Sequence, residues 1–391
     1  MGKRVGIEVS LAVSHAVMLA DVDVIAAYPI TPQTHIVEHL SELVADGELD
    51  AEFIPVESEH SAMSTSVGAA AAGARTFTAT SSQGLALMVE IMYIASSLRL
   101  PIVMTVANRA LSGPISIWND HADMMLARDT GWIQTVAENG QEVFDLVLHA
   151  YRVAEDPRVM LPMIVNLDGF TLSHMIEPIE FLSQEEVNKY LRPYKAPLRM
   201  DPENPITMGP VGMPEVYTEA KKAQDEALKK SKEVIIEAWK EFGNLFGRYY
   251  HPVETYKMED AETAILIMGS LAETAMTAVD RMREKGKKVG IVHPRLFRPF
   301  PHEELVEALK NIKNLAVIDR ALAYNGMGGP LSFELRSVLY DADLRPYLKN
   351  YIAGLGGRDV TVDDFSDIVA DVESCSEKGV KPEYTIVNVR E

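Results

Sequence analysis

Three polar side chains in the first third of this sequence could together handle an acidic substrate and a nitrogen-containing ring: Thr31, Glu59 and Arg109. A glutamate carboxylate can share a proton with a ring nitrogen of a heterocycle. An arginine guanidinium offers two parallel N–H donors, which match the carboxylate of a 2-oxoacid. A threonine hydroxyl adds a neutral hydrogen bond. These residue types suit a 2-oxoacid substrate and a cofactor with a ring nitrogen. Their spacing alone does not identify the substrate or the cofactor more closely.

These residues follow stretches that read as buried strands. Continuous apolar strands alternating with helices predict a parallel sheet covered on both faces. In such sheets ligands bind outside the carboxyl ends of the strands, so the turns that follow the strands should converge on one rim. The predicted strands and their polar turns are 22–28 with 29–34, 52–56 with 57–60, 75–80 with 81–84, 102–107 with 108–109, and 158–166 with 168–170.

Structural explanations exist for several of these residues. Ser58 is a suitable N-cap for a small-residue helix expected over 61–74, so the acidic residues around it could simply complement that helix. Arg109 could form a surface ion pair. Asp120, His121 and Asp123 have metal-binding types, but an ion would need more partners, and no metal site is expected in this chain. The glycine clusters at 326–329 and 354–357 lack a strand–GxGxxG–helix context and indicate tight turns.

Composition limits the possible functions. The chain has 391 residues and a formal charge of −20, which argues against nucleic acid or an anionic membrane as partner. The single cysteine, Cys375, excludes an internal disulfide framework and an iron–sulfur cluster held by this chain alone. No convincing targeting signal and no apolar run of ~18 residues are found, so a cytoplasmic protein is expected.

Two α/β units are expected, because strands and helices alternate in both parts of the chain. The first covers residues 1–175. Residues 176–255 form a proline-rich connection and a strongly helical stretch over 219–246. The second unit covers residues 256–391, with strands predicted at 263–268, 288–292 and 314–319 and helices at 271–285 and 303–310.

Eight segments, taken together and in order, resemble the pyruvate:ferredoxin oxidoreductase family over nearly the whole chain. No single segment is specific, whereas the ordered set is. The length is similar to that of the separate alpha subunit of the multi-subunit enzymes, the pyruvate synthases. The segments are Tyr-Pro-Ile-Thr-Pro-Gln-Thr at 28–34, Glu-Ser-Glu-His at 57–60, Ser-Ser-Gln-Gly at 81–84, Ala-Asn-Arg-Ala at 107–110, Ser-Ile-Trp-Asn-Asp-His at 116–121, Asn-Leu-Asp-Gly-Phe at 166–170, Leu-Phe-Arg-Pro-Phe-Pro at 296–301 and Gly-Leu-Gly-Gly-Arg-Asp at 354–359.

The resemblance implies an α/β fold in which a thiamine-diphosphate pyrimidine-binding domain precedes a transketolase C-terminal-like domain. It implies oxidative decarboxylation of pyruvate with coenzyme A to acetyl-CoA and CO2, reversibly, with reduction of ferredoxin. The diphosphate and its magnesium ion would belong to a beta subunit, and the iron–sulfur clusters to beta and delta subunits. With a gamma subunit as well, the chain would be active only in complex.

The resemblance also implies roles for single residues. Glu59 would bond the aminopyrimidine ring nitrogen of the cofactor, Arg109 would hold the substrate carboxylate, and Thr31 would bond the substrate near its carbonyl. Asn108 and His60 are candidates for supporting positions. Further residues expected beside the cofactor are Pro29, Ser82 and Gln83.

Several alternatives remain open. Gln33 and Thr34 favour pyruvate over a branched-chain 2-oxoacid, 2-oxoglutarate, an aryl glyoxylate or an oxalate-like acid. A non-catalytic scaffolding subunit is a different possibility, and Glu59 on a convergent rim argues against it. A stand-alone thiamine enzyme would need a Gly-Asp-Gly…Asn diphosphate motif, which the sequence lacks.

Overall fold

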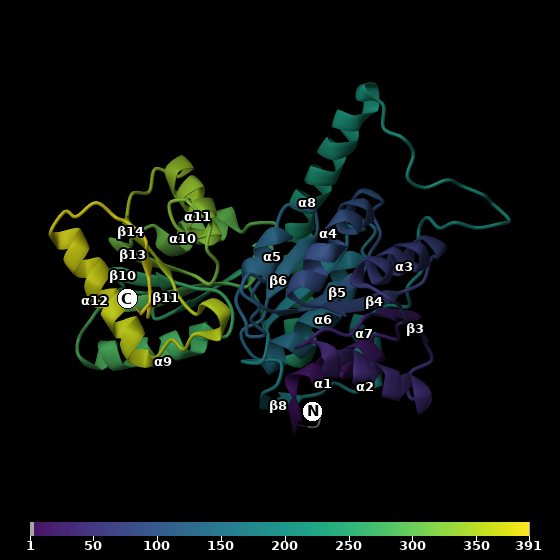
Figure 1. The fold of residues 1–391 in the computed structure, drawn as a ribbon, viewed down its shortest axis with the longest axis horizontal. Coiled ribbons are helices and arrows are strands. Elements are labelled where there is room, and N and C mark those ends of the chain that lie inside the picture. The colour runs from purple at the N-terminus through teal and green to yellow at the C-terminus, as the bar shows by residue number, and fades with distance from the viewer. Residues whose placement is uncertain (1–3, 391) are drawn as a thin grey trace.

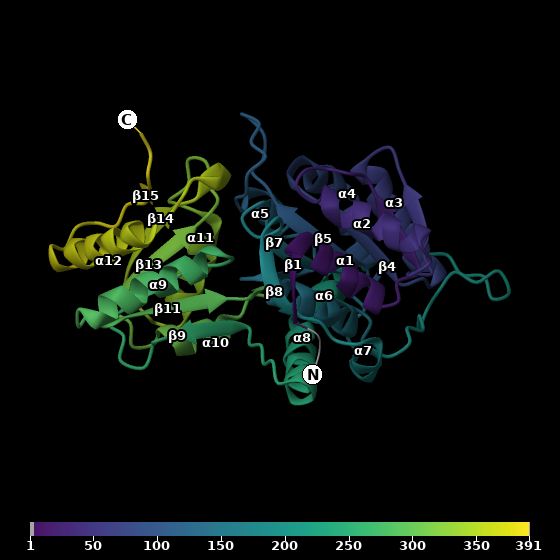
Figure 2. The same ribbon diagram turned by 90° about the horizontal axis from the view of Figure 1, so that it is seen from below.

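The computed structural model describes residues 4–390, which form two α/β lobes lying side by side (Figure 1). The second view shows the same two lobes, with the carboxyl-terminal segment leaving the second lobe at the top of the picture (Figure 2). Within residues 4–390, no helix combines the length and apolar character needed to cross a bilayer.

The first lobe is built on a seven-stranded sheet with the order β12-β6-β7-β5-β4-β2-β3. Neighbouring strands pair in parallel, except that β12 pairs with β6 in antiparallel fashion. Every residue of three central strands, β4, β5 and β7, is buried, as expected for a sheet covered on both faces. The strands are β2 (Val24–Ala27), β3 (Glu52–Pro55), β4 (Thr76–Thr80), β5 (Val103–Asn108), β6 (Ile133–Val136), β7 (Met163–Asp168) and β12 (Leu296–Arg298).

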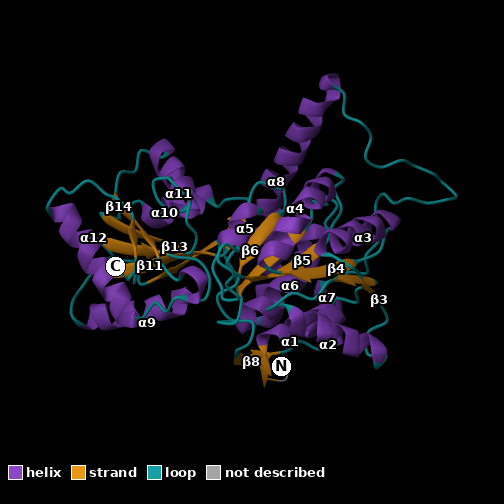
Figure 3. Ribbon diagram, in the orientation of Figure 1, coloured by secondary structure: helices purple, strands orange, loops and turns teal. Residues whose placement is uncertain are grey.

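Helices cover both faces of this sheet, which appears as orange strands between purple helices in Figure 3. One face packs against α3 and α4 and the other against α1, α2 and α6, each through its own apolar core, and α5 lies next to α4. The predicted parallel sheet with two covered faces is confirmed. The helices are α1 (Val9–Leu19), α2 (Thr34–Ala45), α3 (Glu59–Ala72), α4 (Ser82–Ser97), α5 (Ala122–Leu126) and α6 (Gly140–Ala154).

The chain changes direction across the sheet at β2. From β2 the chain passes through α2 to β3 on one side, then through α3 to β4 on the other side of β2. Accordingly, α2 and α3 lie on opposite faces of the sheet. Such a switch opens a crevice at the carboxyl ends of the strands, here between the turns that follow β2 and β4.

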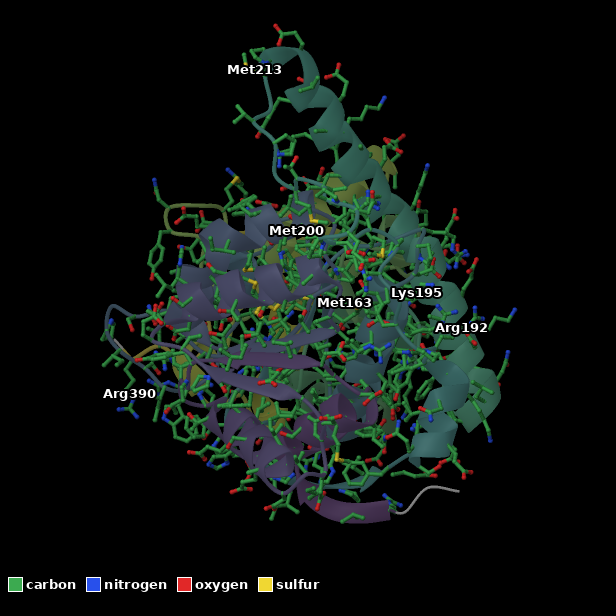
Figure 4. The ribbon with its side chains drawn as sticks, turned by 90° about the vertical axis from the view of Figure 1, so that its right-hand side faces the viewer. Met163, Arg192, Lys195, Met200, Met213 and Arg390 are labelled. Carbon is green, nitrogen blue, oxygen red and sulfur yellow. The ribbon has the colours of Figure 1, made fainter. Side chains whose placement is uncertain are left out.

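A long connection leads from the first lobe to the second. β8 (Ile176–Glu180) pairs with β1 (Arg4–Glu8), and α7 (Gln184–Tyr190) follows. The chain then runs outward to α8 (Pro214–Phe246), whose buried residues begin only at Ala227. Its amino-terminal part therefore projects beyond the body of the molecule, with Met213 at the far end (Figure 4).

The second lobe holds a six-stranded sheet with the order β15-β14-β13-β10-β11-β9. Helices α10 and α11 pack on one face and α9 and α12 on the other. The elements are β9 (Val253–Tyr256), β10 (Thr263–Leu266), α9 (Leu271–Glu284), β11 (Val289–Pro294), α10 (His302–Leu309), β13 (Asn314–Asp319), α11 (Pro330–Asp341), β14 (Tyr347–Ile352), the short 3-10 helix Leu355–Gly357, α12 (Val362–Glu377) and β15 (Thr385–Ile386).

The two lobes share structure. Directly after β11 the chain enters the first lobe and adds β12 to the edge of its sheet beside β6. The core under α10 and α11 also includes Met124, Met125 and Val136 of the first lobe.

Two features of the first sheet differ from the sequence-based expectation. The strand predicted over residues 158–166 begins only at Met163, because Met160 takes a positive φ of 44° and interrupts the extended chain. The same strand extends to Asp168. In addition, β6 was not predicted, since its Gln134 and Thr135 are polar although both are buried.

Candidate active site

The candidate catalytic glutamate lies at the start of α3. Glu59 is the first residue of this helix, and the preceding Ser58 is its N-cap, accepting from the backbone N–H of Ser61 at 3.2 Å. The capping explanation for Ser58 is therefore correct, and it does not account for Glu59. The Glu59 side chain is only 7% exposed, yet among residues 4–390 no hydrogen bond to its carboxylate is found. A nearly buried acceptor without a protein donor is suited to an external donor.

Gly84, in the first turn of α4, leaves the room that Glu59 occupies. A Cβ at this position would lie 2.7 Å from Glu59 Oε1 and 2.9 Å from Glu59 Cγ, and it would also press on the hydroxyl of Thr80. Since ordinary contacts begin near 3.4 Å, any larger residue would displace the carboxylate. Glu59 can therefore keep its position only because residue 84 is a glycine and has no side chain.

Arg109 bridges the two turns that flank the crevice. Its Nη1 donates to the backbone carbonyl of Thr31 at 2.8 Å, and its Nη2 makes a long contact of 3.4 Å with Gln83 Oε1. Burial lowers the pKa of Arg109, whereas the charges of Asp123 and Glu59 oppose this shift. Its Nε is buried and has no partner among the described residues. Arg109 is therefore an interior cation near Glu59, and among residues 4–390 it does not form the surface ion pair that was the structural alternative.

Asp123 organises the rim from beneath, and the sequence did not indicate this role. Its carboxylate accepts from the backbone N–H groups of Ser82 (2.9 Å) and Arg109 (3.0 Å) and from the side chain of Asn108 (2.8 Å). It thereby joins the turns after β4 and β5. Burial raises the pKa of Asp123 to about 6, against the effect of these hydrogen bonds. The only signal in the sequence was the metal-like group at 120–123, where Asp123 binds protein donors.

The remaining residues predicted for the site lie in the same turns, but they differ in exposure and in hydrogen bonding. Pro29 and Thr31 are exposed on the turn after β2. The Ser82 hydroxyl is buried and donates to the carbonyl of Ala110 at 2.6 Å. Gln83 is half-buried beside Arg109. The structure thus brings all six predicted residues to one rim, and their individual roles stay predictions.

Asp168, which the sequence placed on this rim, connects the two lobes. Its carboxylate contacts His121 Nε2 at 3.0 Å and Arg320 Nη1 at 2.7 Å, and accepts from the backbone N–H of Ser270 at 2.9 Å. Burial alone would raise the pKa of Asp168, but the charges of Arg320 and His121 outweigh it and hold the pKa well below its ordinary range. Ser270 and Arg320 belong to the second lobe, so Asp168 helps to hold the two lobes together at the contact between them, which we call the joint.

Other segments that resemble the family also meet at this joint. The backbone N–H of Gly357 donates to the carbonyl of Asn119 at 2.8 Å, and a Cβ on Gly357 would lie 2.5 Å from Trp118 Cβ. The backbone N–H of Gly356 donates to Asp120 at 3.2 Å. The second glycine cluster is therefore a tight turn, as predicted, and it fits against the first lobe.

The turn after β6 adds a buried acid that sequence reasoning missed. Glu138 lies 3.5 Å from the ring of His293, which comes from the end of β11. Burial raises the pKa of Glu138 to about 8, and the neighbouring carboxylates of Glu142 and Glu273 add to the shift. The acid is therefore held in its protonated form inside the joint near neutral pH.

A cleft of about 870 Å³ lies away from these residues, between the projecting part of α8 and the second lobe. Its walls include Tyr93, Tyr217, Lys221 and Phe300, and none of Thr31, Glu59 or Arg109. The residues of the candidate site lie instead at the carboxyl ends of the strands of the first sheet.

Two families of known proteins match the chain. The family described as "Pyruvate flavodoxin/ferredoxin oxidoreductase, thiamine diP-bdg" matches residues 15–240, and "Pyruvate:ferredoxin oxidoreductase core domain II" matches residues 261–365. The pyruvate synthase subunit PorA of Methanocaldococcus jannaschii is 50% identical over 369 residues, 94% of each chain. That of Thermotoga maritima is 52% identical over 360 residues, 92% of this chain and 91% of the relative.

A ketoisovalerate oxidoreductase subunit VorA from Pyrococcus horikoshii is nearly as similar, with 47% identity over 370 residues, 94% of this chain and 93% of the relative. Among solved structures, a 2-oxoglutarate:ferredoxin oxidoreductase from Magnetococcus marinus has a TM-score of 0.70 at 19% identity, covering 96% of this chain and 66% of that one, which shows the shared fold. A split-gene transketolase has a TM-score of 0.54 at 13% identity, covering 95% of this chain and 99% of that one. The chain belongs to the pyruvate flavodoxin/ferredoxin oxidoreductase family, and residues 15–240 form its thiamine-diphosphate-binding domain.

Proposed function

We propose that this chain is the alpha subunit of a multi-subunit pyruvate:ferredoxin oxidoreductase and supplies the pyrimidine-binding half of a thiamine diphosphate site. The observation that carries the proposal is Glu59, an almost buried carboxylate at the switch point with no hydrogen-bond donor from residues 4–390. The diphosphate, its magnesium ion and the iron–sulfur clusters belong to partner chains, the beta and delta subunits, and a gamma subunit completes the complex.

The residues of this chain fit the aminopyrimidine end of the cofactor. Glu59 offers an acceptor for a protonated ring nitrogen, and Gly84 keeps that carboxylate in place by having no side chain. When bound, thiamine diphosphate supplies an electron sink for decarboxylation of a 2-oxoacid. The part of Glu59 is to hold a proton at the ring nitrogen, in surroundings that exclude most water.

Arg109 is suited to bind the substrate carboxylate. The Nε and Nη2 donors of a guanidinium point to the same side, so together they can hold one carboxylate with two parallel hydrogen bonds. In Arg109, Nε is unpartnered among the described residues and Nη2 has only the 3.4 Å contact with Gln83. Nη1 is committed to the carbonyl of Thr31, which fixes the guanidinium and holds the Thr31 turn against it.

The surface next to the site supports a split arrangement. The outer face of α4 exposes Leu87 (48%), Tyr93 (44%) and Ile94 (43%), and the adjoining face of α3 exposes Gly68 and Ala72. An apolar stripe beside a small-residue helix allows another chain to pack closely. Because one cysteine cannot hold a cluster, electron transfer to ferredoxin requires partner chains.

Pyruvate is the proposed substrate, since the relatives with 50–52% identity are pyruvate synthase subunits. A branched 2-oxoacid is the second candidate, because the ketoisovalerate oxidoreductase subunit is 47% identical. A panel of 2-oxoacids assayed with coenzyme A and a viologen acceptor would separate the two.

The test is Glu59→Gln in the complex co-expressed with its partner chains. The amide keeps the volume but cannot take the proton, so turnover should be abolished while the subunits still assemble and retain bound magnesium. Glu57→Gln is the matched control, because Glu57 lies two residues away, is exposed and bonds only Ser61 among the described residues. Full activity of Glu59→Gln would remove Glu59 from the reaction, and activity of the isolated chain would refute the split site.

A further inference from the structure

Three side chains outside the candidate active site come together from separate parts of the first lobe. Glu8 is the last residue of β1, His35 is the second residue of α2, and His174 lies in the turn between β7 and β8. One possible ligand atom from each lies within 4.8 Å of the other two. Within residues 4–390, this is the one group of three or more histidine, cysteine, aspartate or glutamate side chains with such spacing.

The backbones that carry these side chains are fixed to each other. The N–H of Val9 donates to the carbonyl of Met175 at 3.0 Å, and the N–H of Ser10 donates to that of Ser173 at 2.9 Å. These bonds hold Glu8 beside His174. The hydroxyl of Ser14 donates to the carbonyl of Ile36 at 2.9 Å and fixes the start of α2, which carries His35. The three positions are therefore preorganised by main-chain contacts, and only side-chain rotation remains.

An ion pair accounts for two of the three residues. Glu8 Oε1 lies 2.6 Å from His35 Nδ1, which alone would be an ordinary surface pair. The ring of His174 adds a second imidazole, with its centroid 4.5 Å from that of His35. An ion pair does not need this second imidazole, whereas two imidazoles and one carboxylate are a donor set that divalent first-row transition metals prefer.

Two further features suit an ion. Ser173 Oγ lies 2.8 Å from His174 Nδ1, so a proton on Nδ1 can be donated to the hydroxyl and leave Nε2 free as a ligand. Metal-binding histidines almost always use their second nitrogen in this way. The side chains of His35 and Glu8 are 43% and 22% exposed, so an ion can reach them and water can complete its coordination.

We propose that Glu8, His35 and His174 bind a divalent transition-metal ion, with Zn²⁺ as the best match to the donor set. Ligand atoms around tetrahedral zinc lie about 3.3 Å apart. The three side chains lie within 4.8 Å of one another, so they need to close by at most about 1.5 Å. This departs from the expectation of no metal in this chain, and it does not depend on the proposed function.

The position of the ion gives it a structural role. His35 lies four residues after Thr31, and His174 lies four residues after Phe170. The two turns already touch, since a Cβ on Gly169 would lie 2.6 Å from Pro32 Cγ. An ion at Glu8, His35 and His174 ties the turn that carries Thr31 to the turn that follows β7. It therefore stiffens one wall of the crevice without contacting the candidate catalytic residues.

The test uses the full-length chain without an affinity tag, treated with chelator, with Cys375→Ser present throughout to remove the thiol. Titration calorimetry with Zn²⁺ should give one equivalent. Loss of a supporting partner of a ligand weakens metal binding 10–100-fold, so loss of a ligand should cost at least about 100-fold in affinity. His35→Gln and His174→Gln should show this loss. His251→Gln, which removes a histidine that pairs with Glu254 at 3.2 Å, should not.

Cobalt and heating provide independent measurements. Co²⁺ should give a visible absorption band in the parent chain that is lost in the two histidine variants, and Zn²⁺ should raise the melting temperature of the parent only. If circular dichroism shows that a histidine variant does not fold, Glu8→Gln replaces it in the test, because this change keeps the side-chain volume. Glu8→Gln should then show the same loss of zinc affinity. Absence of a zinc equivalent in the parent at submillimolar concentrations, or the same affinity in the folded variants, would overturn the proposal.

Discussion

Replacing Gly84 by alanine tests whether the position of the Glu59 carboxylate matters for turnover. The new Cβ would lie 2.7 Å from Glu59 Oε1, about 0.7 Å closer than the 3.4 Å at which ordinary contacts begin. The start of α4 cannot retreat easily, because the N–H of Ser82 donates to Asp123 and its hydroxyl to Ala110. The new Cβ would also lie still closer to the hydroxyl of Thr80. Thr80 is fully buried in β4, so most of the displacement should fall on the longer and more flexible side chain of Glu59.

The size of the effect can be worked out from these distances. A misplacement of ~1 Å costs about 100-fold in rate, so a shift near 0.7 Å should lower kcat about 10–100-fold, or about 1.4–2.7 kcal/mol in activation free energy. The stability cost is smaller. Overpacking by a methyl costs about 1–3 kcal/mol, and replacing a helical glycine by alanine returns about 0.5–1 kcal/mol.

The assay compares kcat for 2-oxoacid-dependent viologen reduction with thermal unfolding of the same assembled complex. Gly6→Ala is the control, since its Cβ would meet only Ile176 at 3.8 Å. A Gly84→Ala complex with kcat within twofold of the parent would refute the reasoning, because Glu59 would then tolerate displacement. A complex that melts far below the parent would show that Gly84 serves packing.

Three further outcomes are expected. Gly68→Ala should stabilise the isolated chain by about 0.5–1 kcal/mol, since nothing lies within 4 Å of the added methyl. The same change should weaken assembly with the partner chain, as measured by co-purification. Unchanged assembly would show that the α3 face is not an interface. Arg109→Lys keeps the charge but loses the fork and the fixed link to Thr31, so KM for the 2-oxoacid should rise about tenfold or more, and an unchanged KM would count against carboxylate binding. Glu138 keeps its proton up to about pH 8 in the folded protein but releases it near pH 4.5 when unfolded, so stability should fall by up to about 5 kcal/mol as pH rises between these values. Urea unfolding of Glu138→Gln should lack that slope, and an equal slope in both proteins would place the titration elsewhere.

Much of the fold follows from local sequence signals. The strands that carry the candidate site are runs of apolar or β-branched residues, and the helix that presents Glu59 begins at a serine cap. Local signals fail where burial is decided by partners distant in the chain. Gln134 and Thr135 of β6 are buried, and the outer neighbour of β6 in the sheet is β12, which lies more than 150 residues later.

The candidate site shows the same division. The turns that hold Thr31, Glu59 and Arg109 could be placed on one rim because the carboxyl ends of parallel strands must meet there. The roles of Asp123 and Asp168 could not be foreseen. Asp168 binds Ser270 and Arg320, which lie 102 and 152 residues away, and no local pattern marks such a contact.

The strand that crosses between the lobes has a consequence for how the chain is made. During synthesis from the amino terminus, β6 lacks its outer neighbour until residues 296–298 leave the ribosome, although all other strands of that sheet are complete by Asp168. An unpaired sheet edge is a template for wrong pairing with other chains. A nascent chain that pauses within the α8 region, or a fragment cut there, carries this open edge. The first lobe therefore reaches its final form only after residue 298 has been translated.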